Sequence, residues 1–204
     1  KKYDLPWKEL EKQGWIAKAL CTEIRLPLPD DQGLRYAGAD KRLKFRIASE
    51  NPGKINIIKK LFLKHKDDQV LIIGLYLDQL KQIADPLDIP LLTGKTSHSV
   101  REEIYRRFKE KKIKVIAVSK IANFAIDLPD ASVAIQVSGT FGSRQEEAQR
   151  LGRILRPKEG RNQAFFYSLV SRDTTEQQFA FKRQRFLCEQ GYDYRIISHE
   201  DMED

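Results

Sequence analysis

The chain has 204 residues, of which 41% are hydrophobic and 32% charged, so it is long enough for one domain with a real core. No apolar run approaches the ~20 residues that a membrane span needs, and no signal peptide is evident, which argues against a membrane protein. The formal net charge of +8 favours a polyanionic partner, nucleic acid first. On charge alone, a merely soluble basic protein is an equal alternative.

The two cysteines and three histidines give no sign of a disulfide frame or a metal site. Cys21 and Cys188 have no CxxC spacing, so we expect two reduced, buried thiols and a cytoplasmic protein. His65, His98 and His199 are scattered along the chain, which predicts no bound metal.

The first fifty residues differ from the rest, and we expect residues 1–50 to form a lead-in segment. Their composition predicts, in chain order, a small helix with aromatic anchors from Pro6–Trp7 to Gly14–Ile16, an edge strand at Thr22–Leu26, a turn at Asp30–Gly33 and a basic connector at Lys41–Arg46.

Residues 51–172 alternate short apolar runs with amphipathic segments. Strands are expected at Val70–Gly74, Ile89–Leu92, Val115–Val118, Val133–Val137 and Ala164–Val170. Helical stripes lie between them: Ile55 to Phe62 after Asn51–Pro52, Leu77 to Ala84, and Val100 to Phe108, the last opened by a capping box of Ser99 and Glu102. This alternation predicts an α/β fold, a mainly parallel sheet covered by helices on both faces.

Ligands of such sheets bind at the carboxyl ends of the strands. The candidate contact points are therefore the loops at Gly74, Thr93–Gly94, Ser119–Lys120 and Ser138–Gly139.

Residues 173–204 are expected to form a C-terminal helix and tail that pack on this domain. The helix should span Thr175 to Gln190, with Phe179, Phe186 and Leu187 on its apolar side and Lys182, Arg183 and Arg185 making it cationic. The acidic end, residues 199–204, is expected to fray.

The most informative stretch reads Q-R-x-G-R-x-x-R and begins at Gln149. Arg153 and Arg156 are three residues apart, so on a helix they project from one face and suit a phosphate chain. Gly152 in a helix costs roughly 1 kcal/mol of stability compared with alanine. We therefore expect this glycine to permit the close approach of another group rather than to help folding. For a charge run in general, a solvated basic face is the commoner reading. A capping box of Ser143 and Glu146 is expected to open this helix.

Half of a nucleotide-hydrolysing site is missing. Gly94-Lys95-Thr96 resembles the end of a phosphate-binding loop, but the earlier glycine would fall at Ile89. No strand ends in Asp-Glu to hold Mg²⁺. The arginine pair then has the composition of fingers that complete another domain's site. Asp127 is either a turn former or a latch that orients an arginine or accepts a ribose hydroxyl.

These segments resemble motifs of the superfamily 2 helicases: Val70–Gly74 motif IV, Ser119–Pro129 motif V, and Gln149–Arg156 motif VI. The resemblance is more specific for the XPB (xeroderma pigmentosum group B) type of DNA helicase and covers nearly the whole chain. It is carried by Ile126–Ala131, Gly142–Ala148, Ala164–Ser171 with Asp173–Thr174, Lys182–Leu187 and Gln190–Tyr192, with Tyr3, Trp7 and Gly14 in the lead-in segment.

This resemblance implies a three-layer α/β/α RecA-like domain with the P-loop NTPase fold, the second motor domain of an ATP-dependent 3′–5′ DNA helicase. A preceding RecA-like domain would hold ATP and Mg²⁺ through its Walker motifs, so the chain alone is expected to be inactive. The residue roles carried over are arginine fingers for Arg153 and Arg156, nucleotide contacts for Gln149, Asp127 and Gly152, and nucleic-acid contacts for Gly74, Thr93, Gly94, Ser119, Lys120 and Arg144. Besides DNA and the preceding domain, the family suggests a repair nuclease or transcription-repair partners.

Two departures from the family pattern occur in motif V. Ala125 stands where a glycine is common, and Ala122-Asn123-Phe124 differs from the Gly-Asp-Thr of eukaryotic members, which suggests a bacterial branch and a cytoplasmic protein that joins the nucleoid on DNA. The alternatives are a non-motor nucleic-acid-binding module, and a related superfamily 2 translocase or RNA helicase.

Overall fold

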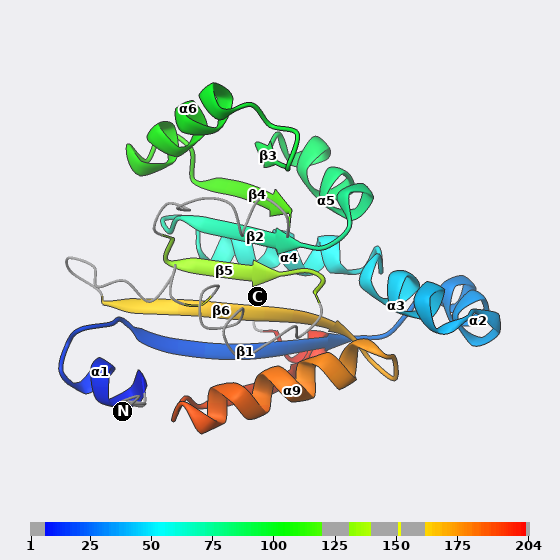
Figure 1. Ribbon diagram of the computed structural model, residues 1–204. Helices are drawn as coiled ribbons and strands as arrows, with labels where there is room; N and C mark the ends of the chain where they lie inside the picture. The colour runs from blue at the N-terminus through cyan, green and yellow to red at the C-terminus, as the bar shows by residue number, and fades with distance from the viewer. Residues whose placement is uncertain (1–6, 120–130, 140–150, 152–161, 203–204) are drawn as a thin grey trace, which may run out of the picture.

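The computed structural model describes residues 7–119, 131–139, 151 and 162–202. In these ranges the chain forms one seven-stranded sheet with the strand order β3-β4-β2-β5-β6-β1-β7 (Figure 1). Every recorded strand pair is parallel. The strands are β1 (Lys18–Leu26), β2 (Val70–Gly74), β3 (Leu91–Leu92), β4 (Val115–Ser119), β5 (Val133–Gln136), β6 (Gln163–Ser171) and β7 (Tyr194–Ser198).

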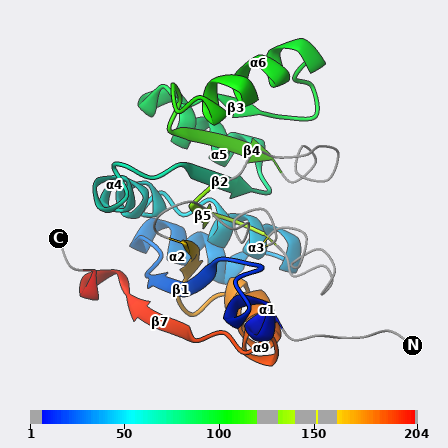
Figure 2. The ribbon, with the colours of Figure 1, turned by 90° about the vertical axis from the view of Figure 1, so that its left-hand side faces the viewer.

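Helices cover both faces of the sheet, which gives the predicted three layers. Helices α4 (Lys54–Lys64) and α5 (Leu77–Ala84) pack on one face through Ile58, Leu61 and Leu80. On the other face, α6 (His98–Lys109) contributes Phe108, and α9 (Glu176–Glu189) contributes Phe186 and Leu187. Figure 2 shows the sheet from its side, between these layers. Within the described ranges, no helix is long and apolar enough to cross a membrane.

The start of the chain is more ordered than its composition predicts. After α1 (Trp7–Lys12), β1 lies between β6 and β7, so the expected edge strand has neighbours on both sides. The expected turn and basic connector are also wrong, since they are helices α2 (Asp30–Gly38) and α3 (Lys41–Ser49). Asp30 and Asp31 lie in the first turn of α2, where negative charge favours a helix.

Helices α2 and α3 project beyond the carboxyl ends of the strands, at the right of Figure 1. Asp40 opens α3 by accepting hydrogen bonds from the amides of Arg42 and Leu43 at 2.8 and 2.9 Å. Only the end of α3 is buried, at Ile47, Ala48 and Ser49.

Three further expectations need correction. Ser97, rather than Ser99, caps α6 and accepts from the Val100 amide. The described part of the tail expected to fray instead continues β7 into a short 3₁₀ helix at His199–Asp201, opened by a capping box of Ser198 and Asp201. Cys21 is buried, as expected, but Cys188 is exposed, and both thiols are free.

Candidate functional site

The strand register brings the predicted contact loops to one edge of the sheet. Gly74 at the end of β2 pairs with Ser119 at the end of β4, and Leu92 of β3 pairs with Val118. On the other side of β2, Ile73 pairs with Gln136 of β5. The carboxyl ends of β3, β4, β2 and β5 therefore lie side by side, where ligands of parallel sheets bind.

Seven predicted site residues lie outside the described residues: Lys120, Asp127, Arg144, Gln149, Gly152, Arg153 and Arg156. The predicted capping box of Ser143 and Glu146 and the departures at Phe124 and Ala125 also lie outside them. The described members of the predicted set are Gly74, Thr93, Gly94 and Ser119.

Gly74 has a packing reason to be glycine. It is buried, and a Cβ added to it would lie 2.8 Å from Leu80 Cδ2, 2.9 Å from Leu80 Cγ and 3.1 Å from Val137 Cγ2. The absence of a side chain lets α5 approach the end of β2. Ser119 is buried as well, at 2% exposure.

The exposed part of this edge is the turn between β3 and α6. Thr93 accepts hydrogen bonds from the Thr96 amide through its carbonyl, at 3.2 Å, and from the Lys95 amide through its hydroxyl, at 3.1 Å. Arg101 donates to the carbonyls of Thr93 and Thr96 at 3.1 and 3.2 Å, a contact that the sequence did not predict. Gly94 and Lys95 face solvent at the tip of this internally bonded turn.

A buried ion pair lies where β5 ends. Lys54 Nζ contacts both carboxylate oxygens of Glu176, at 3.0 and 2.9 Å, and both side chains are almost fully buried. It also donates to the carbonyls of Ser49 at 3.0 Å and Val137 at 2.8 Å. Burial lowers the pKa of the Lys54 ammonium, and the Glu176 carboxylate opposes that shift.

Sequence reasoning missed this pair although a signal was present. Lys54 is four residues before Ile58 and seven before Leu61, so a helix places it on the buried face. A lysine on an apolar stripe requires a buried partner. Nothing in the sequence pattern identified Glu176 as that partner.

Ser138 and Gln79 extend the polar cluster around the end of β5. Ser138 Oγ donates to Gln79 Oε1 at 2.5 Å and accepts from the Leu75 amide at 2.9 Å. Gln79 Nε2 donates to the carbonyls of Ser49 at 2.5 Å and Val137 at 3.3 Å. The residues just before Gly139 are thereby fixed from several sides.

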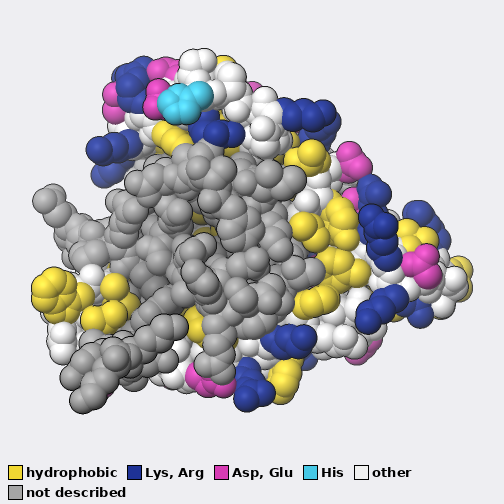
Figure 3. Space-filling view, viewed as in Figure 1, with side chains coloured by type: hydrophobic (Ala, Val, Ile, Leu, Met, Phe, Trp, Pro, Cys, Tyr) yellow, Lys and Arg dark blue, Asp and Glu magenta, His cyan; other side chains and the backbone are white. Residues whose placement is uncertain are grey.

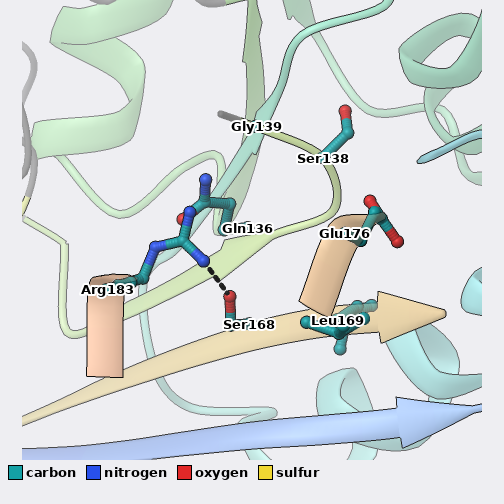
Figure 4. Close-up of a pocket in the computed structure, with 8 residues that line it drawn as sticks. Gln136, Ser138, Gly139, Ser168, Leu169, Glu176 and Arg183 are labelled. Atoms are coloured by element: carbon teal, nitrogen blue, oxygen red, sulfur yellow. Dashed lines mark hydrogen bonds between the residues drawn. The ribbon is translucent and has the colours of Figure 1, made fainter. Parts of the chain in front are cut away.

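A very small polar pocket adjoins this cluster (Figure 4). Arg183 lines it from α9 and donates to Ser168 Oγ of β6 at 3.0 Å. Arg183 is only 2% exposed, so it points inward, whereas Lys182 and Arg185 remain on the outer, cationic side of α9. Among the described residues, the amide of Gln136 is buried in this pocket with neither Oε1 nor Nε2 hydrogen-bonded.

Basic side chains are also exposed on α3. Arg46 pairs with Glu50 at 3.1 Å and with Asp78 at 2.8 Å, and it lies over the Tyr76 ring. Lys41 and Arg42 are exposed on the same helix. In Figure 3, lysine and arginine side chains occur at several places around the face shown.

His65 is explained by the core instead of a ligand. Its Nδ1 lies 2.8 Å from Asp68 Oδ2, and its Nε2 lies 2.8 Å from the hydroxyl of Tyr167. Burial raises the pKa of Tyr167 to about 12. Among the described residues, no group of three or more His, Cys, Asp or Glu side chains could hold a metal ion.

Solved structures with a similar fold come from helicases. The C-terminal domain of the DEAD-box protein Dbp5 superposes with a TM-score of 0.67 at 14% identity, over 91% of this chain and 92% of that one. A DEAD box protein from Methanococcus jannaschii gives a TM-score of 0.57 at 17% identity, over 92% of this chain and 43% of that one. With the parallel sheet and its two helical layers, these likenesses show the RecA-like fold, as predicted.

Sequence comparison narrows the class to a family. The model of the ERCC3/RAD25/XPB C-terminal helicase matches residues 10–204. "DNA 3'-5' helicase XPB" of Kineococcus radiotolerans is 51% identical over 203 residues, and that of Mycobacterium tuberculosis 50% over 202 residues. The two matches cover 100% and 99% of this chain, but only 36% and 37% of the two relatives.

A eukaryotic relative is less similar. "General transcription and DNA repair factor IIH helicase/translocase subunit XPB" of Drosophila melanogaster is 40% identical over 206 residues, 98% of this chain and 26% of that protein. The chain belongs to the ERCC3/RAD25/XPB C-terminal helicase family and spans about a third of the length of the two bacterial relatives. The family prediction is confirmed, and the higher bacterial identities agree with the predicted bacterial branch.

Proposed function

We propose that this chain is the second motor domain of an ATP-dependent 3′–5′ DNA helicase or translocase. The observation that carries the proposal is the shared carboxyl edge of β3, β4, β2 and β5, from which the chain enters all the segments with predicted nucleotide and nucleic-acid contacts. Membership of the XPB family and the printed names of the bacterial relatives support it.

In this proposal the two arginines act on a nucleotide held chiefly by the preceding RecA-like domain. Arg153 and Arg156 donate to the phosphates of ATP when the two domains close, and they stabilise the charge that develops on the transferred phosphoryl group. Gln149, Asp127 and Gly152 contact the nucleotide across the cleft. The preceding domain supplies the phosphate-binding loop and the carboxylates for Mg²⁺.

The DNA track is proposed to run along the same edge. Gly94 and Lys95 are exposed at the tip of the turn after β3, and Lys120 and Arg144 follow β4 and β5 in the sequence. Because Gly74 and Ser119 are buried, we propose that they shape this edge, and that Thr93 supports the turn that presents Gly94. Contacts to phosphates suit tracking along any sequence.

The test is Arg153→Ala in the full-length protein. Loss of an arginine finger should lower kcat for DNA-stimulated ATP hydrolysis by ~10³ or more, while DNA affinity stays close to the parental value. Steady-state phosphate release and DNA binding at fixed salt measure the two quantities.

The matched control is Arg185→Ala, which removes an exposed arginine that pairs with Glu189 on α9. It should leave kcat near the parental value. If Arg153→Ala keeps the parental kcat, the finger assignment is wrong, and a nucleic-acid-binding module without a motor role becomes the better explanation.

A further inference from the structure

Lys54 is a buried cation whose partners come from three separate elements. Its side chain is 1% exposed, and its ammonium has acceptors at the end of α3, the end of β5 and the first turn of α9. Lys54 itself begins α4. An ammonium has three protons, and here two carbonyls and a carboxylate use them.

Stability alone is a weak reason for such a pair. Removing two charges from water offsets most of their mutual attraction, and replacing both partners by neutral groups is often tolerated. Removing one partner is much worse because it leaves the other charge buried and unpaired. What the pair does provide is a fixed geometry, because every partner must remain in place to satisfy it.

The backbone held in place by these contacts is the point where the chain leaves β5. Val137 donates its amide to Ile73 of β2 at 2.9 Å, and its carbonyl accepts from Lys54 and Gln79. The next residue, Ser138, is held by Gln79 and by the Leu75 amide. The chain then continues through Gly139 into the segment that carries Arg153 and Arg156.

Glu176 ties the same point to the end of β6. Its carboxylate accepts from the Ser171 amide at 2.9 Å as well as from Lys54. The hydroxyl of Ser171 donates to the carbonyl of Ala48 in α3 at 2.7 Å. Strand β6 ends at Ser171, so α3, α9 and the carboxyl ends of β5 and β6 share one polar frame.

We propose that Lys54 is a positioning residue for ATP turnover, which holds the root of the arginine segment at Val137 and Ser138 against α3 and α9. The inference rests on the proposed function, because it assigns Lys54 a part in placing the arginine fingers. A displacement of about 1 Å in a catalytic group can cost ~10²-fold in rate, so loosening this root should reduce turnover.

The first test is the double variant Lys54→Met/Glu176→Gln in the full-length protein. It removes both charges and the lysine's carbonyl contacts, and the glutamine oxygen can still accept from the Ser171 amide. We expect a loss of about 10- to 100-fold in kcat for DNA-stimulated ATP hydrolysis. The KM for ATP, the DNA affinity and the melting temperature should stay near the parental values.

The matched control is Lys12→Met/Glu9→Gln, the same change at an exposed pair with a separation of 3.2 Å. It should change none of these quantities. A second variant, Gln79→Met, removes no charge but loses the contacts to Ser138 and Val137, and it should show a smaller loss of kcat with the same unchanged KM.

A parental kcat in either Lys54→Met/Glu176→Gln or Gln79→Met, at a parental melting temperature, overturns the inference. Loss of the fold in both variants also overturns it, since the cluster would then serve stability alone. Arg153→Ala separates the two proposals: if that variant loses turnover while the Lys54 variants do not, only the positioning role fails. If Arg153→Ala keeps its turnover, the finger assignment fails, and with it the proposed motor role of this chain.

Discussion

Gly74 ends β2 beside the predicted nucleic-acid contacts, yet its nearest neighbours are the core residues Leu80 and Val137. The family resemblance assigned it a contact role, whereas the structure gives a packing reason for its missing side chain. The DNA role of this position stays a prediction, and packing must be separated from it by measurement.

At the scale of this residue, Gly74→Ala should lower the free energy of unfolding by about 1–3 kcal/mol, because a Cβ would overpack against Leu80. Urea unfolding followed by circular dichroism measures it. Gly33→Ala is the matched control: nothing lies within 4 Å of its added Cβ, and in α2 it should stabilise by up to ~1 kcal/mol. Equal effects of the two changes would contradict the packing explanation.

Among the helices and strands, those with a clear apolar period were predicted well. Strand β2 and helix α5 have the predicted bounds, because each is determined by a local pattern: four consecutive apolar residues in β2 and one amphipathic stripe in α5. Helix α2 was missed because Asp and Gly are typical of turns. Helix α3 was missed because only its end is buried, although its Lys and Arg residues are good helix formers. Strand β7 is exposed at several positions, so it shows no apolar run.

Asp40 is the N-cap of helix α3. Asp40→Ala removes the acceptor of two amides in the first turn and should destabilise the protein by about 0.5–2 kcal/mol. Thermal or urea unfolding measures the loss. Asp67→Ala, which removes an exposed carboxylate 3.8 Å from Lys114, should change stability by less than about 0.5 kcal/mol. A loss no larger than that of the control would show that the Asp40 cap contributes little.

At the scale of the whole molecule, the sequence predicted the edge of the sheet where the candidate site lies. It did not predict the buried polar frame around Lys54 that supports this edge. The strand pattern placed Thr93, Ser119 and Ser138 at one edge, because all strands of a parallel sheet end on the same side. The frame around Lys54 joins residues more than a hundred positions apart, such as Glu176. The hydrophobic periodicity of one segment cannot reveal such pairs, since it carries no information on which helices and strands pack against each other.

The missing phosphate-binding loop leads to a prediction for the chain as a unit. Residues 1–204 alone should show no measurable ATP hydrolysis, with or without DNA, because the proposed fingers would have no bound nucleotide to act on. Phosphate release by the purified chain, compared with the full-length protein at equal concentration, measures this. Turnover by the chain alone would place the catalytic groups within it and contradict the divided site.

Strand β1 lies between β6 and β7, so it waits for two partner strands that follow it by more than a hundred residues. During synthesis at about 5–20 residues per second, β1 would leave the ribosome roughly 7 to 30 seconds before β6. Until then its backbone has no sheet partner on either side, and long-range pairing of this kind slows folding. Newly made chains should therefore depend on chaperones until translation passes β7, and a truncation that removes β6 and β7 should leave β1 prone to aggregate.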